Sequence, residues 1–217
     1  MKTDKQLQTD VIAELSWEPS VHAAEIGVEV KDGVVTLAGH VGSYAEKWNA
    51  ERAAQRVSGV KALAVEMDVN LSALGKRSDA DIARSAENVL SWAASVPDGA
   101  IKVMVEGGWI TLSGAVDWQY QKQAASDAVR FLIGVQGVSD QIAIKPTVIM
   151  KAVKADIEAA LNRRATRESK KISVKVDGAD VTLTGTVHSY AERELATNSA
   201  WGTPGVRNVV DEMTLAY

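Results

Sequence analysis

The sequence predicts a mixed fold of helices and strands (α/β in the broad sense, α+β in the strict one). It consists of three tandem α-β-β-α-β units, each with two helices packed on a small three-stranded mixed sheet. Its main support is self-similarity. Residues 26–39, 101–114 and 172–185 read IGVEVKDGVVTLAG, IKVMVEGGWITLSG and ISVKVDGADVTLTG, at offsets of 75 and 146 residues. A Gly-Val pair recurs at the same offsets, and the window between holds no gap. Self-similarity at a fixed spacing is the signature of a repeated structural unit.

The first element of each unit is predicted to be an amphipathic helix. Leu7, Val11 and Leu15 are spaced four residues apart, which places them on one helical face. The matching positions of the other two units hold the same kind of side chain: Ile82, Ala86 and Leu90, then Val153, Ile157 and Leu161. We therefore expect three equivalent helices, each with one buried stripe.

Two strands are predicted to follow the first helix. Ile26, Val28 and Val30 alternate with polar residues, and Val35 with Leu37 continues the inward face on the second strand. An Asp-Gly, Gly-Gly or Gly-Ala pair separates the two runs, and glycine accommodates the positive φ of a tight hairpin.

The second helix is expected to begin at a capping sequence. Ser43 with Glu46 and Ser189 with Glu192 fit S-x-x-E, in which the two side chains satisfy backbone N–H groups of the first turn. The middle unit offers Asp117 as a cap. In the third unit Pro204 is expected to end the helix early.

A third strand closes each unit, and the inward residues of the first copy are Leu63, Val65, Met67 and Val69. The predicted units span residues 1–71, 77–146 and 148–217. The second helix is expected to cover the same sheet face as the first. The opposite face is then either covered by another unit or open to solvent.

Composition and charge narrow the range of possible functions. Hydrophobic residues make up 46% of the chain, yet no run of about 18 of them predicts a transmembrane segment. The polar start lacks a signal peptide's apolar core, so we expect a cytoplasmic protein, or a periplasmic one only if a leader has been removed. Cysteine is absent, and the net charge of −4 argues against a nucleic-acid partner.

The repeated pattern I-x-V-x-V, a turn, [VI]-T-L-x-G-x-V, a capped helix and a Gly-Val pair resembles the BON domain, also called the transport-associated domain. Its signature glycines would be Gly39, Gly59, Gly114, Gly134, Gly185 and Gly205. The resemblance implies two helices on a small mixed sheet. It also implies association with phospholipid membranes, envelope protection under osmotic stress, and chaperone-like contact with other proteins.

No arrangement of residues predicts catalysis. His22, His40 and His188 do not cluster with one another, and no serine, histidine and aspartate recur together across the units. We expect no catalytic residue, no cofactor and no metal site. The predicted function is a non-enzymatic, stress-related binding protein for phospholipid membranes or client proteins. The alternative is a cytoplasmic interaction scaffold or chaperone-like module without lipid binding, and oligomers are compatible with either.

Met104 and Trp109 are the candidate partner contacts. Met104 matches Glu29 and Lys175, and Trp109 matches Val34 and Asp180, so both are expected on the outward sheet face of the middle unit. Exposed apolar groups often mark contact surfaces. The two interpretations are packing between units of one chain and contact with a partner, another copy or lipid.

A basic stretch in the third unit is the candidate for anionic lipid. Its residues are Arg163, Arg164, Arg167, Lys170 and Lys171. Cations near the end of a helix complement the helix dipole, which is one explanation. Attraction to anionic headgroups, worth about 1 kcal/mol per basic residue near a charged surface, is the other.

Overall fold

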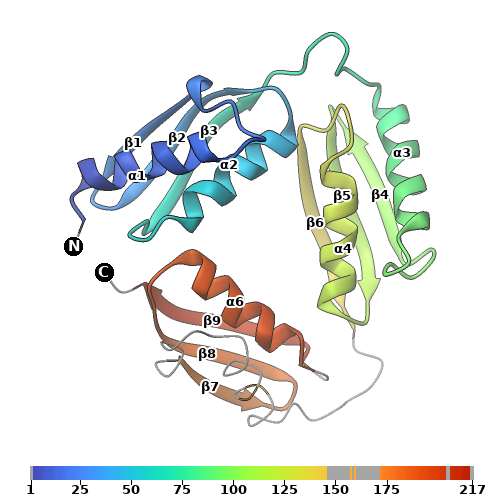
Figure 1. Ribbon diagram of the computed structural model, residues 1–217. Helices are drawn as coiled ribbons and strands as arrows, with labels where there is room; N and C mark the ends of the chain where they lie inside the picture. Colours follow the sequence, from blue (N-terminus) through green and yellow to red (C-terminus); the bar gives the residue numbers. More distant parts are fainter. Residues whose placement is uncertain (1, 146–156, 158, 160–171, 204–205, 216–217) are drawn as a thin grey trace.

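The computed structural model describes residues 2–145, 157, 159, 172–203 and 206–215 (Figure 1). The first unit contains α1 (Asp4–Trp17), η1 (Ala23–Glu25), β1 (Ile26–Lys31), β2 (Val34–Val41), α2 (Tyr44–Arg56) and β3 (Ala62–Val69). The second contains α3 (Asp79–Trp92), β4 (Ile101–Glu106), β5 (Trp109–Val116), α4 (Gln119–Arg130) and β6 (Gly137–Ile144). The third contains β7 (Ile172–Asp177), β8 (Asp180–Val187), α6 (Tyr190–Trp201) and β9 (Asn208–Leu215).

Each unit has its own three-stranded mixed sheet, which confirms the predicted fold class. The order is β1-β2-β3, β4-β5-β6 and β7-β8-β9. In every sheet the first two strands are antiparallel, and the third pairs in parallel with the central one. The parallel pairing requires a crossover between the strands, which the second helix provides.

The apolar stripes lie where the periodicity predicted them. Leu7, Val11 and Leu15 are buried on α1, and their counterparts on α3 are buried too. In the third unit Ile157 is helical and fully buried, while Val153 and Leu161 lie outside the described residues. The buried residues form three separate clusters, one for each unit. Every unit therefore has a core of its own.

The hairpin turns are held by the first helix. Asp4, in the first turn of α1, accepts hydrogen bonds from the backbone N–H groups of Asp32 and Gly33 at 2.8 and 3.0 Å. Asp79 of α3 does the same for Gly107 and Gly108 at 2.8 Å. These turn residues have positive φ, the backbone form that the glycine pattern predicted.

The helix caps differ from the prediction in two respects. Ser43 and Ser189 cap α2 and α6 as expected, but the carboxylates of Glu46 and Glu192 accept from residues before the cap. In the middle unit the cap residue is Trp118 rather than Asp117, because the amide oxygen of Gln121 accepts both backbone N–H groups there. A side-chain amide replaces the missing carboxylate.

The third unit's helix, which Pro204 was expected to end early, ends one residue before the position where α2 ends and level with the end of α4. The last residue of α6 is Trp201, which is the position that Arg130 holds at the end of α4. Both helices therefore end at equivalent positions, although only the third unit has a proline nearby. The proline therefore shortens the helix by one residue at most.

The signature glycines occupy backbone conformations that other residues rarely adopt. Their φ values are +136° at Gly39, +105° at Gly59, +131° at Gly114, +95° at Gly134 and +132° at Gly185. Gly205 lies outside the described residues. These glycines shape the backbone and bring no chemistry of their own.

The three units are arranged with their second helices toward a common centre (Figure 1). Helices α2, α4 and α6 form the inner sides, and α2 packs directly against α6. Helices α1 and α2 cover one face of the first sheet, α3 and α4 cover one face of the second, and α6 packs on the third. The other sheet face points away from the centre.

Candidate functional site

The second helices meet head to tail, so that the first turn of one helix faces the last turn of the next. There are three such junctions: α2 onto α4, α6 onto α2, and α4 onto α6. Because the units repeat, the same helix positions are used each time. The junctions can therefore be compared position by position.

The α2–α4 junction is closed by aromatic and cationic side chains. The Trp48 ring meets that of Phe131 edge to face, with centroids 6.4 Å apart. The guanidinium of Arg130 lies 4.1 Å from the Trp48 ring centroid. Tyr44 packs against the second unit's core, and burial raises the pKa of its phenol. The charge of Arg130 and the backbone of Val138 act to lower that pKa, but burial outweighs them.

The α6–α2 junction is closed by the equivalent tyrosine. Tyr190 packs against the first unit's core, and its hydroxyl donates to the carbonyl of Lys61 at 2.6 Å. Arg52 and Glu194 form an ion pair at 2.6 Å. The remaining pocket between α2 and α6 has a volume of about 310 Å³. Tyrosine at the first helical position thus anchors two of the three junctions.

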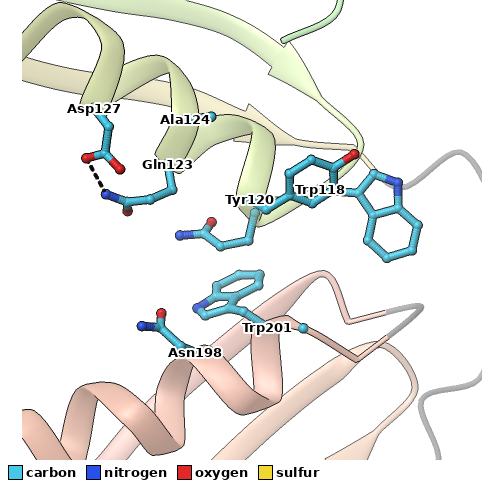
Figure 2. Close-up of a pocket in the computed structure, with 9 residues that line it drawn as sticks. Trp118, Tyr120, Gln123, Ala124, Asp127, Asn198 and Trp201 are labelled. Atoms are coloured by element: carbon cyan, nitrogen blue, oxygen red, sulfur yellow. Dashed lines mark hydrogen bonds between the residues drawn. The ribbon is translucent and has the colours of Figure 1, made fainter. Parts of the chain in front are cut away.

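The α4–α6 junction is open and forms the candidate site (Figure 2). Its pocket has a volume of about 780 Å³, more than twice that of the α2–α6 pocket. The residues that line it come from the start of α4 and the end of α6: Trp118, Gln119, Tyr120, Gln123, Ala124, Asp127, Asn198, Trp201 and Gly202. We call it the α4–α6 pocket.

The α4–α6 pocket is wider because its sequence departs from the other junctions. Gln119 takes the place of Tyr44 and Tyr190, so the anchoring aromatic ring is missing. Gln123 takes the place of Trp48 in the first unit. The Gln119 amide is shorter than the tyrosine ring at the other two junctions, and Gln123 is shorter than Trp48 at one of them.

Aromatic rings gather at one end of the pocket. Trp118 and Tyr120 lie on the α4 side and Trp201 on the α6 side (Figure 2). Trp118 is 38% exposed and Tyr120 59% exposed. Amides and one acid line the rest, where Gln123 donates to Asp127 at 3.0 Å. No lysine or arginine is among the described lining residues. The pocket therefore favours apolar and aromatic groups over anions.

Met104 and Trp109 lie on the outward sheet face of the middle unit, 58% and 50% exposed. Trp109 pairs with Gly137 on the neighbouring strand, and a Cβ at that glycine would lie 2.3 Å from the Trp109 ring. The indole therefore covers a glycine of its own sheet. Their role in partner contact stays a prediction.

The structure does not describe the predicted contact with anionic lipid. The basic residues Arg163, Arg164, Arg167, Lys170 and Lys171 lie outside the described residues. Among the residues that the structure describes, no group of three or more acids and histidines gathers as metal ligands would. In the same part of the chain, no helix has the length and hydrophobicity to cross a bilayer.

Sequence reasoning missed the aromatic residues of the α4–α6 pocket. The signal was present, because Trp118 replaces two serines, Tyr120 replaces two alanines, and Trp201 replaces Gln55 and Arg130. Each is an aromatic ring at a position where the other copies are small or polar. That these positions meet across two units follows only from the arrangement of the helices.

The BON domain family model matches the chain three times, over residues 3–70, 78–146 and 151–217. The chain belongs to the BON domain family. Osmotically-inducible protein Y of Escherichia coli (strain K12) is a relative, 30% identical over 146 residues, which are 65% of this chain and 73% of that protein. Three tandem BON domains thus account for nearly all of the sequence.

Solved structures give weaker likenesses to this BON protein. CdsD, a structural protein of the type III secretion system of Chlamydia trachomatis, aligns with a TM-score of 0.26 at 15% identity, over 96% of this chain and 91% of that one. The PrgH periplasmic domain aligns with a TM-score of 0.22 at 13% identity, over 89% and 96%. Scores this low say nothing about function.

Proposed function

We propose that this protein is a non-enzymatic, stress-related binding protein that holds apolar segments of client proteins. One observation carries the proposal: the α4–α6 pocket exposes the rings of Trp118, Tyr120 and Trp201 at a junction whose two counterparts are closed. Partly exposed aromatic side chains in a concave surface are typical of recognition sites for peptides and small apolar groups. The family and the osmotically inducible relative support the stress-related part.

The charge of the pocket supports a protein segment over an anionic ligand. Asp127 is the only charged residue among the described residues that line it. A phosphate or carboxylate placed there would lose its hydration without gaining a cation. An apolar side chain loses nothing comparable and gains contact with the rings.

Suppression of aggregation tests client binding. A chemically denatured test protein, such as reduced lysozyme, is diluted from denaturant with and without this chain, and light scattering is followed. We expect slower aggregation in its presence, and a weaker effect for Trp201→Ala, which removes one wall of the pocket. Aggregation at the same rate in a several-fold excess of the wild-type chain would contradict the proposal.

A phospholipid surface is the second candidate partner, because the first helices of units one and two each end in an exposed tryptophan. Trp17 is 83% exposed and Trp92 is 90% exposed, at equivalent positions of α1 and α3. Tryptophan is enriched where proteins meet the bilayer interface. Co-flotation with phosphatidylglycerol vesicles at low salt is the test, with Trp17→Ser/Trp92→Ser as the variant. If the variant floats as well as the wild type, these tryptophans are not the contact.

A further inference from the structure

We propose that the α4–α6 pocket receives an aromatic side chain, best of all a tyrosine, from a partner polypeptide. The two other junctions supply this group from within the chain. The inference rests on the proposed binding of client proteins and names the side chain that is recognised.

The first support is internal comparison. Tyr44 and Tyr190 occupy the first position of their helices, and each inserts its ring against the core of the neighbouring unit. The Tyr190 hydroxyl also donates to the carbonyl of Lys61, the residue before β3. Gln119 holds this position in α4, and the pocket there is the larger one. The two junctions that contain a tyrosine thus indicate that the α4–α6 junction lacks a tyrosine ring.

The second support is the start of the third strand, which the same backbone hydrogen bond holds in all three units. The backbone N–H of Lys61 donates to the carbonyl of Gly33 at 2.9 Å. That of Arg207, the equivalent residue in the third unit, donates to Ala179 at 2.8 Å. The same local hydrogen bond gives Arg207 the backbone position in its own unit that Lys61 has in the first unit. If a phenol enters the third unit as Tyr190 enters the first, we expect the Arg207 carbonyl to be its acceptor.

The third support is the chemistry of the lining. The rings of Trp118, Tyr120 and Trp201 offer faces and edges to an incoming ring. Tyr120 does not close the junction itself, since it remains 59% exposed. The absence of lysine and arginine among the described lining residues disfavours an acidic side chain.

A titration of the intact chain with short blocked peptides tests the proposal. The peptides have the sequence acetyl-Gly-Ser-Xaa-Ser-Gly-amide, with tyrosine, leucine or aspartate as Xaa, and the indole N–H signals are followed by NMR. The tyrosine peptide should shift the signals of Trp118 and Trp201 and leave those of Trp17 and Trp92 unchanged. The leucine peptide should bind about threefold to tenfold more weakly, since aromatic pairing adds about 0.5–1.5 kcal/mol.

Gln119→Tyr is the decisive variant because it restores the residue of the other two junctions. Its ring should fill the pocket from within, and the tyrosine peptide should then bind at least about tenfold more weakly. Gln141→Tyr, at an exposed position of β6, is the matched control for adding a tyrosine to the surface. Unchanged peptide affinity in Gln119→Tyr would overturn the proposal, as would equal affinity for tyrosine and leucine peptides.

These outcomes separate the inference from the proposed function. If the chain suppresses aggregation of a denatured client while no peptide shifts Trp118 or Trp201, the pocket is not the aromatic site and the general function stands. If the wild-type chain suppresses no aggregation, the proposed function fails. Shifts at Trp17 and Trp92 with the tyrosine peptide would place binding elsewhere and overturn the inference.

Discussion

At Gly39 and Gly114, a backbone carbonyl occupies the space that a Cβ would need. An added Cβ would lie 2.2 Å from the Glu25 oxygen at Gly39 and 2.1 Å from the Ala100 oxygen at Gly114. Both glycines also have φ in the region that disfavours other residues. The close approach lets the chain before the first strand cross the end of the second.

Gly114→Ala should therefore destabilise the protein by more than about 3 kcal/mol, because backbone strain and a steric clash add together. Gly99→Ala is the control: its φ is +66°, but no atom lies within 4 Å of the added Cβ. Strain alone should cost about 1 kcal/mol there. Denaturant unfolding compares the two, and equal losses would show that the clash does not matter.

His22 and Glu46 form a pair whose contribution depends on pH. The imidazole Nδ1 lies 2.7 Å from the Glu46 carboxylate, whose hydrogen bond and charge raise the pKa of His22. Burial acts to raise the pKa of Glu46, but the backbone N–H groups of His22 and Gly42 and the imidazole outweigh it, so the net change is downward.

The stabilisation from protonated His22 is thus fully present below its unfolded pKa of about 6.5 and is lost as the pH rises through the higher folded value. His22→Gln should be less stable than the wild type at about pH 5.5, and the gap should narrow by about pH 8.5. The effect should be small, since the imidazole is largely exposed. Urea unfolding at both pH values measures it, and a gap that widens with pH would contradict the assignment.

At the scale of elements, residues at the ends of the second helices also hold neighbouring units together. In α2 the first turn anchors the unit to its neighbour through Tyr44 and Trp48. In α4 the last turn receives them, with Arg130 buried and paired with Asp127. The docking therefore depends on side chains that helix propensity alone does not select.

Trp48→Leu should loosen the first unit from the second. The change removes the ring that faces Phe131 and Arg130, whose buried Nε has no hydrogen-bond partner among the described residues. We expect a loss of about 2 to 4 kcal/mol and thermal unfolding in more than one step, as docking fails before the separate cores melt. Trp17→Leu, at an 83% exposed tryptophan, is the control and should change little. A single transition with unchanged midpoint for Trp48→Leu would refute this role.

At the scale of the whole molecule, the segment between β3 and α3 joins the first two units. The predicted boundaries leave residues 72–76 outside both units, and Lys76 and Arg77 provide tryptic sites near this segment. Brief trypsin treatment of the folded chain should cut there before it cuts within α2 or α4, whose backbones are hydrogen-bonded. Mass spectrometry of the first fragments checks this. First cuts inside either helix would contradict the boundaries.

The units were predictable from the sequence and their junctions were not. The stripe of Leu7, Val11 and Leu15, the strand alternation and the hairpin turns follow from local periodicity, which the structure confirms. The cap at Trp118 depends on Gln121, three residues later in the sequence, which is a weaker sequence signal than S-x-x-E. The α4–α6 pocket joins residues from two units, and nothing in their spacing places Trp118 opposite Trp201.

The head-to-tail arrangement has an energetic consequence for the whole chain. The two closed junctions and the α4–α6 pocket lie around one centre, so we expect a change of angle at one junction to be taken up by the others. Filling the α4–α6 pocket would then alter the hydrogen bond between Tyr190 and Lys61, and Tyr190→Phe would in turn alter affinity at the pocket by the same factor. Such reciprocity is required by thermodynamic linkage. We therefore expect the protein's affinity for a ligand to depend partly on residues that do not touch the ligand.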